Sequence, residues 1–213
     1  MEIAIVLFEK VTATDLIGPY EVLSRLPGAV VRFVATTPGV KRTDTGFLGL
    51  SADHAIRDVP RPDVVVVPGG PGQMRAMDDA ALLDWLRTAH ETTTWTTSVC
   101  SGSLLLGKAG LLRGKRATSN WAVRDELREF GATPTAARVV FDGKLVTAAG
   151  VTAGFDMALT LASRIAGEPF AQAVQLGIEY DPEPPFDTGS PEKAPPEMVE
   201  MVRSLMKNEA DAA

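Results

Sequence analysis

Apolar residues alternate along the chain between two kinds of pattern. Continuous or β-branched apolar runs predict strands at five places, residues 2–8, 30–35, 63–67, 94–99 and 138–148. The last of these contains Asp142-Gly143, a dipeptide typical of a two-residue hairpin turn. Apolar residues at helical spacing predict helices over residues 14–25, 78–90, 101–109, 121–130, 152–166 and 170–179.

The alternation of strands and helices predicts an α/β fold with a mainly parallel central sheet and helices on both faces, a flavodoxin-like sandwich. The run Val64–Val67 is apolar without interruption, so we expect its strand to be central and covered on both sides. Residues 1–213 contain no internal repeat and are predicted to form one domain.

Residues 181–196 differ from the rest of the chain, because six of these sixteen residues are proline. That density excludes a helix or the interior of a sheet and predicts an extended arm, followed by a short helix over residues 196–207. The arm is either a surface tail or, because Tyr180 and Phe186 are apolar, a segment that packs on a partner subunit. We predict a homodimer with residues 180–196 in its interface.

Composition and charge narrow the classes of function. Of 213 residues, 45% are hydrophobic and 23% charged, and the net charge of -6 makes nucleic acid and anionic membranes unexpected partners. No apolar run approaches the ~20 residues of a membrane span, and the N-terminus lacks a signal-peptide pattern. A single cysteine cannot form an internal disulfide, which favours a reducing cytoplasm. His54 and His90 lie far apart with no metal-binding motif nearby, so no metal site is expected.

The most informative residue is Cys100, which lies where a predicted strand ends at Val99 and a predicted helix begins near Ser101. Small neighbours such as Gly102 permit a tight turn, the arrangement of a nucleophile elbow. Amide groups at a helix N-terminus favour a thiolate, so we expect Cys100 to be acidic and easily oxidised, unless a nearby carboxylate opposes this. The alternative is that Cys100 is a small buried hydrophobe.

Two further features are predicted at the same sheet edge as Cys100. The loop 68–72, Pro-Gly-Gly-Pro-Gly, follows the central strand, and its glycines are either a plain turn or a source of backbone amides for a ligand. Asp15 follows the first strand and either caps the next helix or exchanges a proton with the thiol. The carboxyl ends of parallel strands meet at one edge, so together these features predict a site.

Four segments resemble the ThiJ/PfpI superfamily, which has a class I glutamine amidotransferase-like fold. They are LFEKVTATDLIGPYEVL, VVPGGPG, SVCSGSLLLGKAGLLRGKRAT and VTAGFDMALTLASRIAG. The C-terminal stretch AVQLGIEYDPEPPFDTGSP is similar to the isocyanide hydratases within that superfamily, because most other members lack such an arm.

The resemblance implies a role for each site residue. Cys100 matches the family nucleophile and Asp15 the acidic residue beside it, while Ser101 stands where the hydratases usually have threonine. Gly70 lies on the loop whose amide faces the nucleophile, so the amides of Gly70 and Ser101 would orient the reacting group. Many relatives carry histidine at the positions of Ser101 or Asn120, and its absence disfavours a Cys–His hydrolase.

The reaction implied by the resemblance is hydration of an organic isocyanide to an N-formamide through a thioimidate on Cys100, without a metal or organic cofactor. Two alternatives remain open. The chain could be a ligand or redox sensor that acts through Cys100 oxidation, as the similar N-terminal domains of AraC-type regulators suggest; only about 17 residues follow Pro196, so a DNA-binding domain is not expected. It could also be another thiol enzyme, such as an amidase or a glyoxalase-type hydratase.

Overall fold

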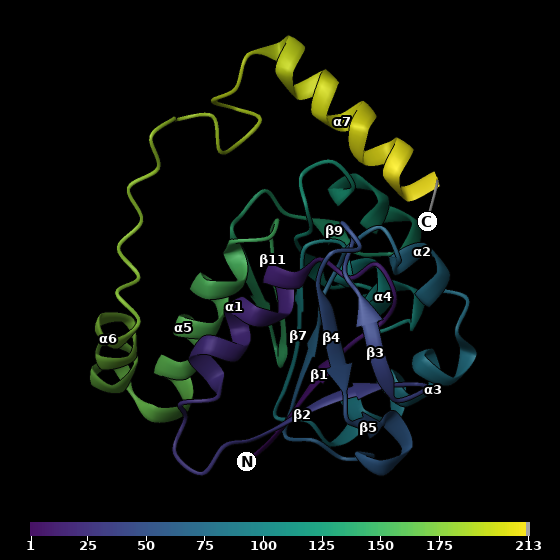
Figure 1. Ribbon diagram of the computed structural model, residues 1–213, viewed down its shortest axis with the longest axis vertical. Helices are drawn as coiled ribbons and strands as arrows, with labels where there is room; N and C mark the ends of the chain where they lie inside the picture. The colour runs from purple at the N-terminus through teal and green to yellow at the C-terminus, as the bar shows by residue number, and fades with distance from the viewer. Residues whose placement is uncertain (212–213) are drawn as a thin grey trace.

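The computed structural model describes residues 1–211, and its centre is a seven-stranded sheet in the order β10-β11-β7-β6-β1-β2-β5 (Figure 1). Every neighbouring pair is parallel except β10–β11, the predicted hairpin. The predicted mainly parallel sheet is therefore confirmed. Its strands are β1 Glu2–Val6, β2 Val30–Ala35, β5 His54–Ala55, β6 Val64–Val67, β7 Trp95–Val99, β10 Val139–Asp142 and β11 Leu145–Ala148.

Four short strands outside this sheet were not predicted from the sequence. Strands β3 (Gly39–Arg42) and β4 (Gly49–Ala52) form an antiparallel pair, and β8 (Arg116–Ala117) pairs with β9 (Thr133–Pro134). They are two to four residues long and mix apolar residues with glycine, proline and polar residues, so no apolar run marks them.

Helices cover both faces of the sheet, as predicted. The connections β1–α1–β2 and β6–α3–β7 run in opposite directions across the sheet, so right-handed crossovers place α1 and α3 on opposite faces. Helices α1, α5 and α6 pack as one group, whereas α3, α4 and η2 form another (Figure 1). The helices are α1 Ala13–Leu23, α2 Gln73–Ala76, α3 Ala80–Thr92, α4 Gly102–Lys108, α5 Ala153–Ala166, α6 Glu168–Gly177 and α7 Pro196–Asp211, with 3-10 turns η1 Ile56–Asp58 and η2 Arg124–Phe130.

The prediction of an amphipathic α-helix over residues 121–130 is wrong. Residues 121–123 form a turn, and Arg124–Phe130 is a 3-10 helix. The side chain of Asn120 accepts a hydrogen bond from the Ala122 amide, and the carbonyl of Asn120 accepts one from Val123, so the chain turns more tightly than an α-helix.

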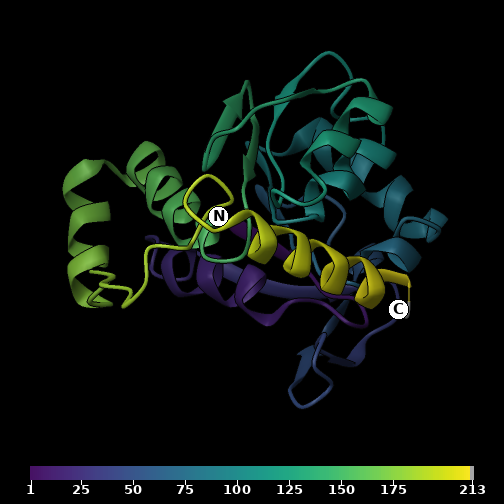
Figure 2. The same ribbon diagram turned by 90° about the horizontal axis from the view of Figure 1, so that it is seen from above.

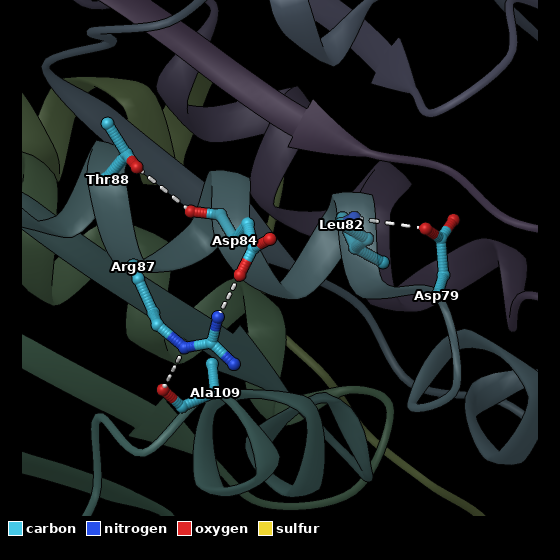
Figure 3. Close-up of polar contacts among 6 residues, drawn as sticks. All are labelled: Asp79, Leu82, Asp84, Arg87, Thr88 and Ala109. Atoms are coloured by element: carbon cyan, nitrogen blue, oxygen red, sulfur yellow. Dashed lines mark hydrogen bonds and ion pairs between the residues drawn. The ribbon is translucent and has the colours of Figure 1, made fainter.

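Helix α3 is tied to α4, the helix that follows Cys100 (Figure 3). Asp79 caps α3 by accepting a hydrogen bond from the Leu82 amide at 3.1 Å. Further along, the Arg87 side chain donates to the carbonyl of Ala109 at the C-terminal end of α4, at 3.1 Å, and pairs with Asp84. The Arg87–Ala109 bond therefore ties the C-terminal end of α4, the helix that begins beside Cys100, to α3.

The C-terminal arm follows α6 in the sequence, packs first against α5 and then leads to α7. Tyr180 stacks on Phe155 with ring centroids 5.2 Å apart and donates a hydrogen bond to Asp156 at 3.2 Å. Residues 181–195 contain no helix or strand, and α7 then lies across the end of the molecule to which the sheet strands point (Figures 1 and 2). Helix α7 extends to Asp211, four residues beyond the predicted end. Within the described residues, no helix is both long and apolar enough to cross a membrane.

Candidate active site

The sharp turn between β7 and α4 holds Cys100 in a left-handed backbone conformation with φ of 58°. Its amide donates to the carbonyl of Ala149 at 2.9 Å, and its carbonyl accepts hydrogen bonds from the hydroxyls of Ser103 and Ser119, at 3.3 and 2.9 Å. A non-glycine residue at positive φ is uncommon and is maintained here by these bonds. The predicted elbow is present, and its thiol is buried.

Two glycines allow the loop after β6 to approach this elbow closely. A Cβ on Gly102 would lie 2.2 Å from the carbonyl oxygen of Val67, and one on Gly69 would lie 2.5 Å from Oγ of Ser101. Neither position has room for a side chain, because the atoms that would be struck belong to the backbone or to the site itself. The glycines therefore bring β6, the 68–72 loop and the start of α4 into contact.

Asp15 lies in the first turn of α1 and is fully buried. Its Oδ2 atom accepts a hydrogen bond from the Gly69 amide at 2.9 Å, 54 residues away in sequence. Its Oδ1 atom is buried without a hydrogen-bonding partner among the described residues. Helix α1 is preceded by Thr12, so Asp15 does not cap this helix, and its carboxyl instead faces the thiol of Cys100.

Burial controls the ionisation of both acids. It raises the pKa of Asp15 to about 7, although the hydrogen bond from the Gly69 amide and the neighbouring Cys100 thiol oppose the rise. Burial and the negative charge of Asp15 raise the pKa of Cys100 to about 12, whereas interactions with Val151, Ser101 and the Asn120 side chain lower it. The expectation of an acidic thiol is therefore wrong, because desolvation outweighs the start of α4. Near neutral pH the thiol keeps its proton, and Asp15 is poised between its neutral and charged forms.

Ser101 and Gly70 lie together, but in a different arrangement from the one expected. The Gly70 amide donates a hydrogen bond to Oγ of Ser101 at 3.1 Å, so it is already engaged rather than free to face the nucleophile. Because the Ser101 hydroxyl accepts the Gly70 hydrogen bond through its oxygen, it can still donate its own proton to another group. Ser101 is 9% exposed and lines the same pocket as Cys100.

Sequence reasoning left the contribution of three further groups unassigned. Asn120 is buried, and its Oδ1 is held by the Ala122 amide at 2.9 Å, which leaves the amide nitrogen of its side chain near the thiol. Val151, with φ of 25°, presents its backbone amide to Cys100. Gln73 is buried in the wall of the pocket. Only Asn120 carried a sequence signal, its place where many relatives have histidine.

Cys100 opens onto a cavity of about 510 Å³ between the loop edge of the sheet and α7. Neither histidine lines it: His54 contacts Arg32, and His90 contacts Thr96. In residues 1–211, no three His, Cys, Asp or Glu side chains cluster as a metal site would need. The lining residues are Thr12, Asp44, Gly70, Pro71, Gln73, Met74, Cys100, Ser101, Asn120, Ala122, Val123, Glu126, Val151, Arg203, Met206, Lys207, Glu209 and Ala210.

Known proteins share both the sequence and the fold. Over 203 residues the chain is 47% identical to an isonitrile hydratase of Pseudomonas putida, covering 95% of this chain and 89% of that protein. It is 29% identical over 176 residues to the HTH-type transcriptional regulator CdhR of Pseudomonas aeruginosa, covering 81% of this chain but spanning only 52% of that regulator.

The crystal structure of a ThiJ/PfpI family protein from Pseudomonas syringae has the same fold, with a TM-score of 0.94 and 38% sequence identity over 99% of this chain and 89% of that one. Residues 1–164 match the DJ-1/PfpI family, the stretch that contains β1, the 68–72 loop and the elbow at Cys100. The resemblance carried by these motifs is confirmed, and the chain belongs to the DJ-1/PfpI family.

Proposed function

We propose that the protein hydrates organic isocyanides, R–NC, to N-formamides, R–NH–CHO, with Cys100 as the nucleophile. The observation that carries the proposal is the 47% identity to an isonitrile hydratase across 95% of the chain. The site is compatible with this chemistry, because a thiol and a carboxyl are buried side by side at the end of a cavity of about 510 Å³.

In the first step, Sγ of Cys100 attacks the isocyanide carbon. Asp15, as a carboxylate, accepts the thiol proton while the S–C bond forms and delivers it to the same carbon, which gives the thioimidate Cys–S–CH=N–R. A thiol whose pKa is raised to about 12 contains little free thiolate at neutral pH and needs such a base. Asp15, with a pKa of about 7, is suited to exchange protons there.

In the second step, water attacks the thioimidate carbon. Asp15 accepts a proton from the water and passes it to the nitrogen, and the C–N double bond becomes single. The resulting adduct collapses by breaking its C–S bond, which releases R–NH–CHO and returns a proton to Cys100. One water is added in total and no electrons are exchanged, so the balance needs no oxidant or reductant.

Ser101 is assigned to orient the reacting nitrogen. Its hydroxyl accepts the Gly70 amide at 3.1 Å and therefore has its own proton to donate into the cavity. In this scheme Gly70 acts through Ser101 rather than by touching the substrate.

The proposal is tested by incubating the protein with a simple aryl isocyanide in water enriched in oxygen-18. The expected product is the N-aryl formamide carrying the heavy isotope in its carbonyl. Recovery of unreacted isocyanide at the rate of a protein-free control would refute it.

A sensor is the second candidate function, favoured by the match to the regulator CdhR. A sensor would bind its ligand or become oxidised at Cys100 without turnover. The raised pKa of the thiol counts against rapid oxidation, since thiolate character governs that reaction. More than one formamide formed per protein molecule would distinguish the enzyme from the sensor.

We also propose that the protein acts as a homodimer in the reducing cytoplasm. The arm exposes apolar surface, with Phe186 75% exposed and Leu176, on the adjoining helix, 81% exposed. A partner subunit that covered these side chains would remove their apolar surface from water.

A further inference from the structure

Helix α7 turns an apolar face toward the body of the fold. Val199, Val202, Met206 and Ala210 are half-buried, whereas the residues between them are mostly exposed. These positions are spaced as one face of a helix. Figures 1 and 2 show α7 lying across the end of the molecule to which the sheet strands point, and its C-terminal half contributes to the lining of the cavity that contains Cys100.

The contacts that fix α7 lie beside the active site. The Arg203 guanidinium lies over the ring of Trp121, 5.1 Å from its centroid, and donates to the carbonyl of Ala122 at 3.4 Å. Trp121 and Ala122 directly follow Asn120, whose side chain contacts the thiol. The position of α7 is thus coupled to the segment that shapes the cavity.

The cavity favours an apolar substituent on its ligand. The apolar side chains of Met74, Val123 and Val151 line the fold side, and Met206 lines the α7 side. The charged residues of the lining include both signs and therefore give no preference for a charged group; they are Asp44, Glu126, Arg203, Lys207 and Glu209.

We propose that α7 is the outer wall of the active site and that Met206 on it selects isocyanides by the size of an apolar substituent. This inference rests on the proposed function for its substrate. The position of the wall does not, because the cavity and the half-burial of Met206 are properties of the fold. A flexible methionine fits this role, since it adapts to apolar groups of different shape.

The first test compares Met206→Trp with Leu205→Trp in the full-length chain. Leu205 is 54% exposed and does not line the cavity, so the same enlargement there is the matched control. For Met206→Trp we expect kcat/KM for cyclohexyl isocyanide to fall at least about tenfold relative to that for methyl isocyanide. Met206→Ala should shift the ratio in the opposite direction, and Leu205→Trp should leave it unchanged.

A second test measures how easily reagents reach Cys100 past α7, without using isocyanides. The rates at which iodoacetamide and the bulkier N-phenylmaleimide alkylate Cys100 are compared in the same variants. Met206→Trp should slow the bulky reagent at least about tenfold more than the small one. If the alkylation ratio changes in Met206→Trp but the protein forms no formamide, α7 is still the outer wall of the site and only the proposed function is rejected. An alkylation ratio equal to that of Leu205→Trp would overturn the inference, whatever the hydration assay gives.

Discussion

Asp15 and Cys100 are two acids buried side by side, and burial makes the ionisation of each less favourable. Burial raises the pKa of Asp15 to about 7 and that of Cys100 to about 12, and the charge of Asp15 adds to the second shift. Near neutral pH the thiol therefore keeps its proton, whereas Asp15 is poised between its neutral and charged forms. That state suits the proposed mechanism, in which the thiol loses its proton to Asp15 only as it attacks.

Replacement of Asp15 by Asn separates a proton-transfer role from a structural one. Asn retains the shape and can still accept the Gly69 amide, but it cannot exchange a proton. We expect kcat for isocyanide hydration to fall by roughly 10²–10⁴-fold, with the folded structure retained. Steady-state kinetics and an unfolding midpoint are measured on the same preparation. A kcat equal to that of the wild type would return Asp15 to a structural role.

The raised pKa of Asp15 also predicts how stability changes with pH. Between its ordinary value of 3.8 and the native value of about 7, the folded protein binds more protons than the unfolded chain. Its contribution to stability is therefore complete below about pH 4 and is lost as the pH rises through 7. Urea unfolding of Asp15→Asn and the wild type should show a difference that grows in favour of the variant between pH 4.5 and 8. A constant difference would contradict the raised pKa.

At the scale of elements, periodicity predicted most helices and every strand of the central sheet except β5, and it failed on the separate strand pairs and on residues 121–130. The runs that became β1, β6 and β7 are buried and continuously apolar or β-branched, so their local pattern and their tertiary environment agree. Residues 121–130 carry a helical pattern, but the Asn120 side chain bonds the Ala122 amide and tightens the turn.

The candidate site could also be predicted in part from the sequence. The elbow at Cys100 follows from where a strand pattern ends and a helix begins, and the edge it shares with Asp15 follows from the parallel order of strands. The bond from the Gly70 amide to Ser101 and the wall formed by α7 depend on contacts between distant segments, which no local pattern records.

Close packing of α4 against β6 predicts a sharp cost at Gly102. In Gly102→Ala the new Cβ would lie 2.2 Å from the Val67 carbonyl oxygen and 2.7 Å from that of Pro68, so backbone must move. We expect a loss of about 1–3 kcal/mol in the free energy of unfolding, together with reduced activity. Gly177→Ala is the matched control, because a Cβ there meets nothing within 4 Å, and its helix should gain about 0.5 kcal/mol. Equal stability of the two variants would contradict the packing.

At the scale of the whole molecule, the arm connects two different surfaces. It starts with Tyr180 stacked on Phe155 of α5 and ends at α7 over the active site. Residues 182–189 between these ends are exposed, so the arm itself buries little surface within its own chain. A partner subunit that covers the arm would stabilise both the arm and the position of α7.

The proposed dimer predicts that Phe186→Asp weakens association. Burying a phenylalanine contributes about 1.5–3 kcal/mol, so its loss together with a buried charge should raise the dimer Kd by about 10–100-fold in sedimentation. Phe47→Asp makes the same change on the loop between β3 and β4, where Phe47 is 92% exposed, and should leave association unchanged. A wild-type monomer at micromolar concentration would exclude the dimer.

The most direct test of a thiol-dependent hydratase is the rate of formamide formation in Cys100→Ala and Cys100→Ser, measured beside the wild type with one aryl isocyanide. The chain contains no other cysteine, so no second thiol can substitute. Both variants remove the sulfur while keeping a small side chain at the elbow, and circular dichroism checks that the fold is retained. The account predicts turnover in the wild type and no formation above the protein-free rate in either variant. Turnover by Cys100→Ala at the wild-type rate would contradict it.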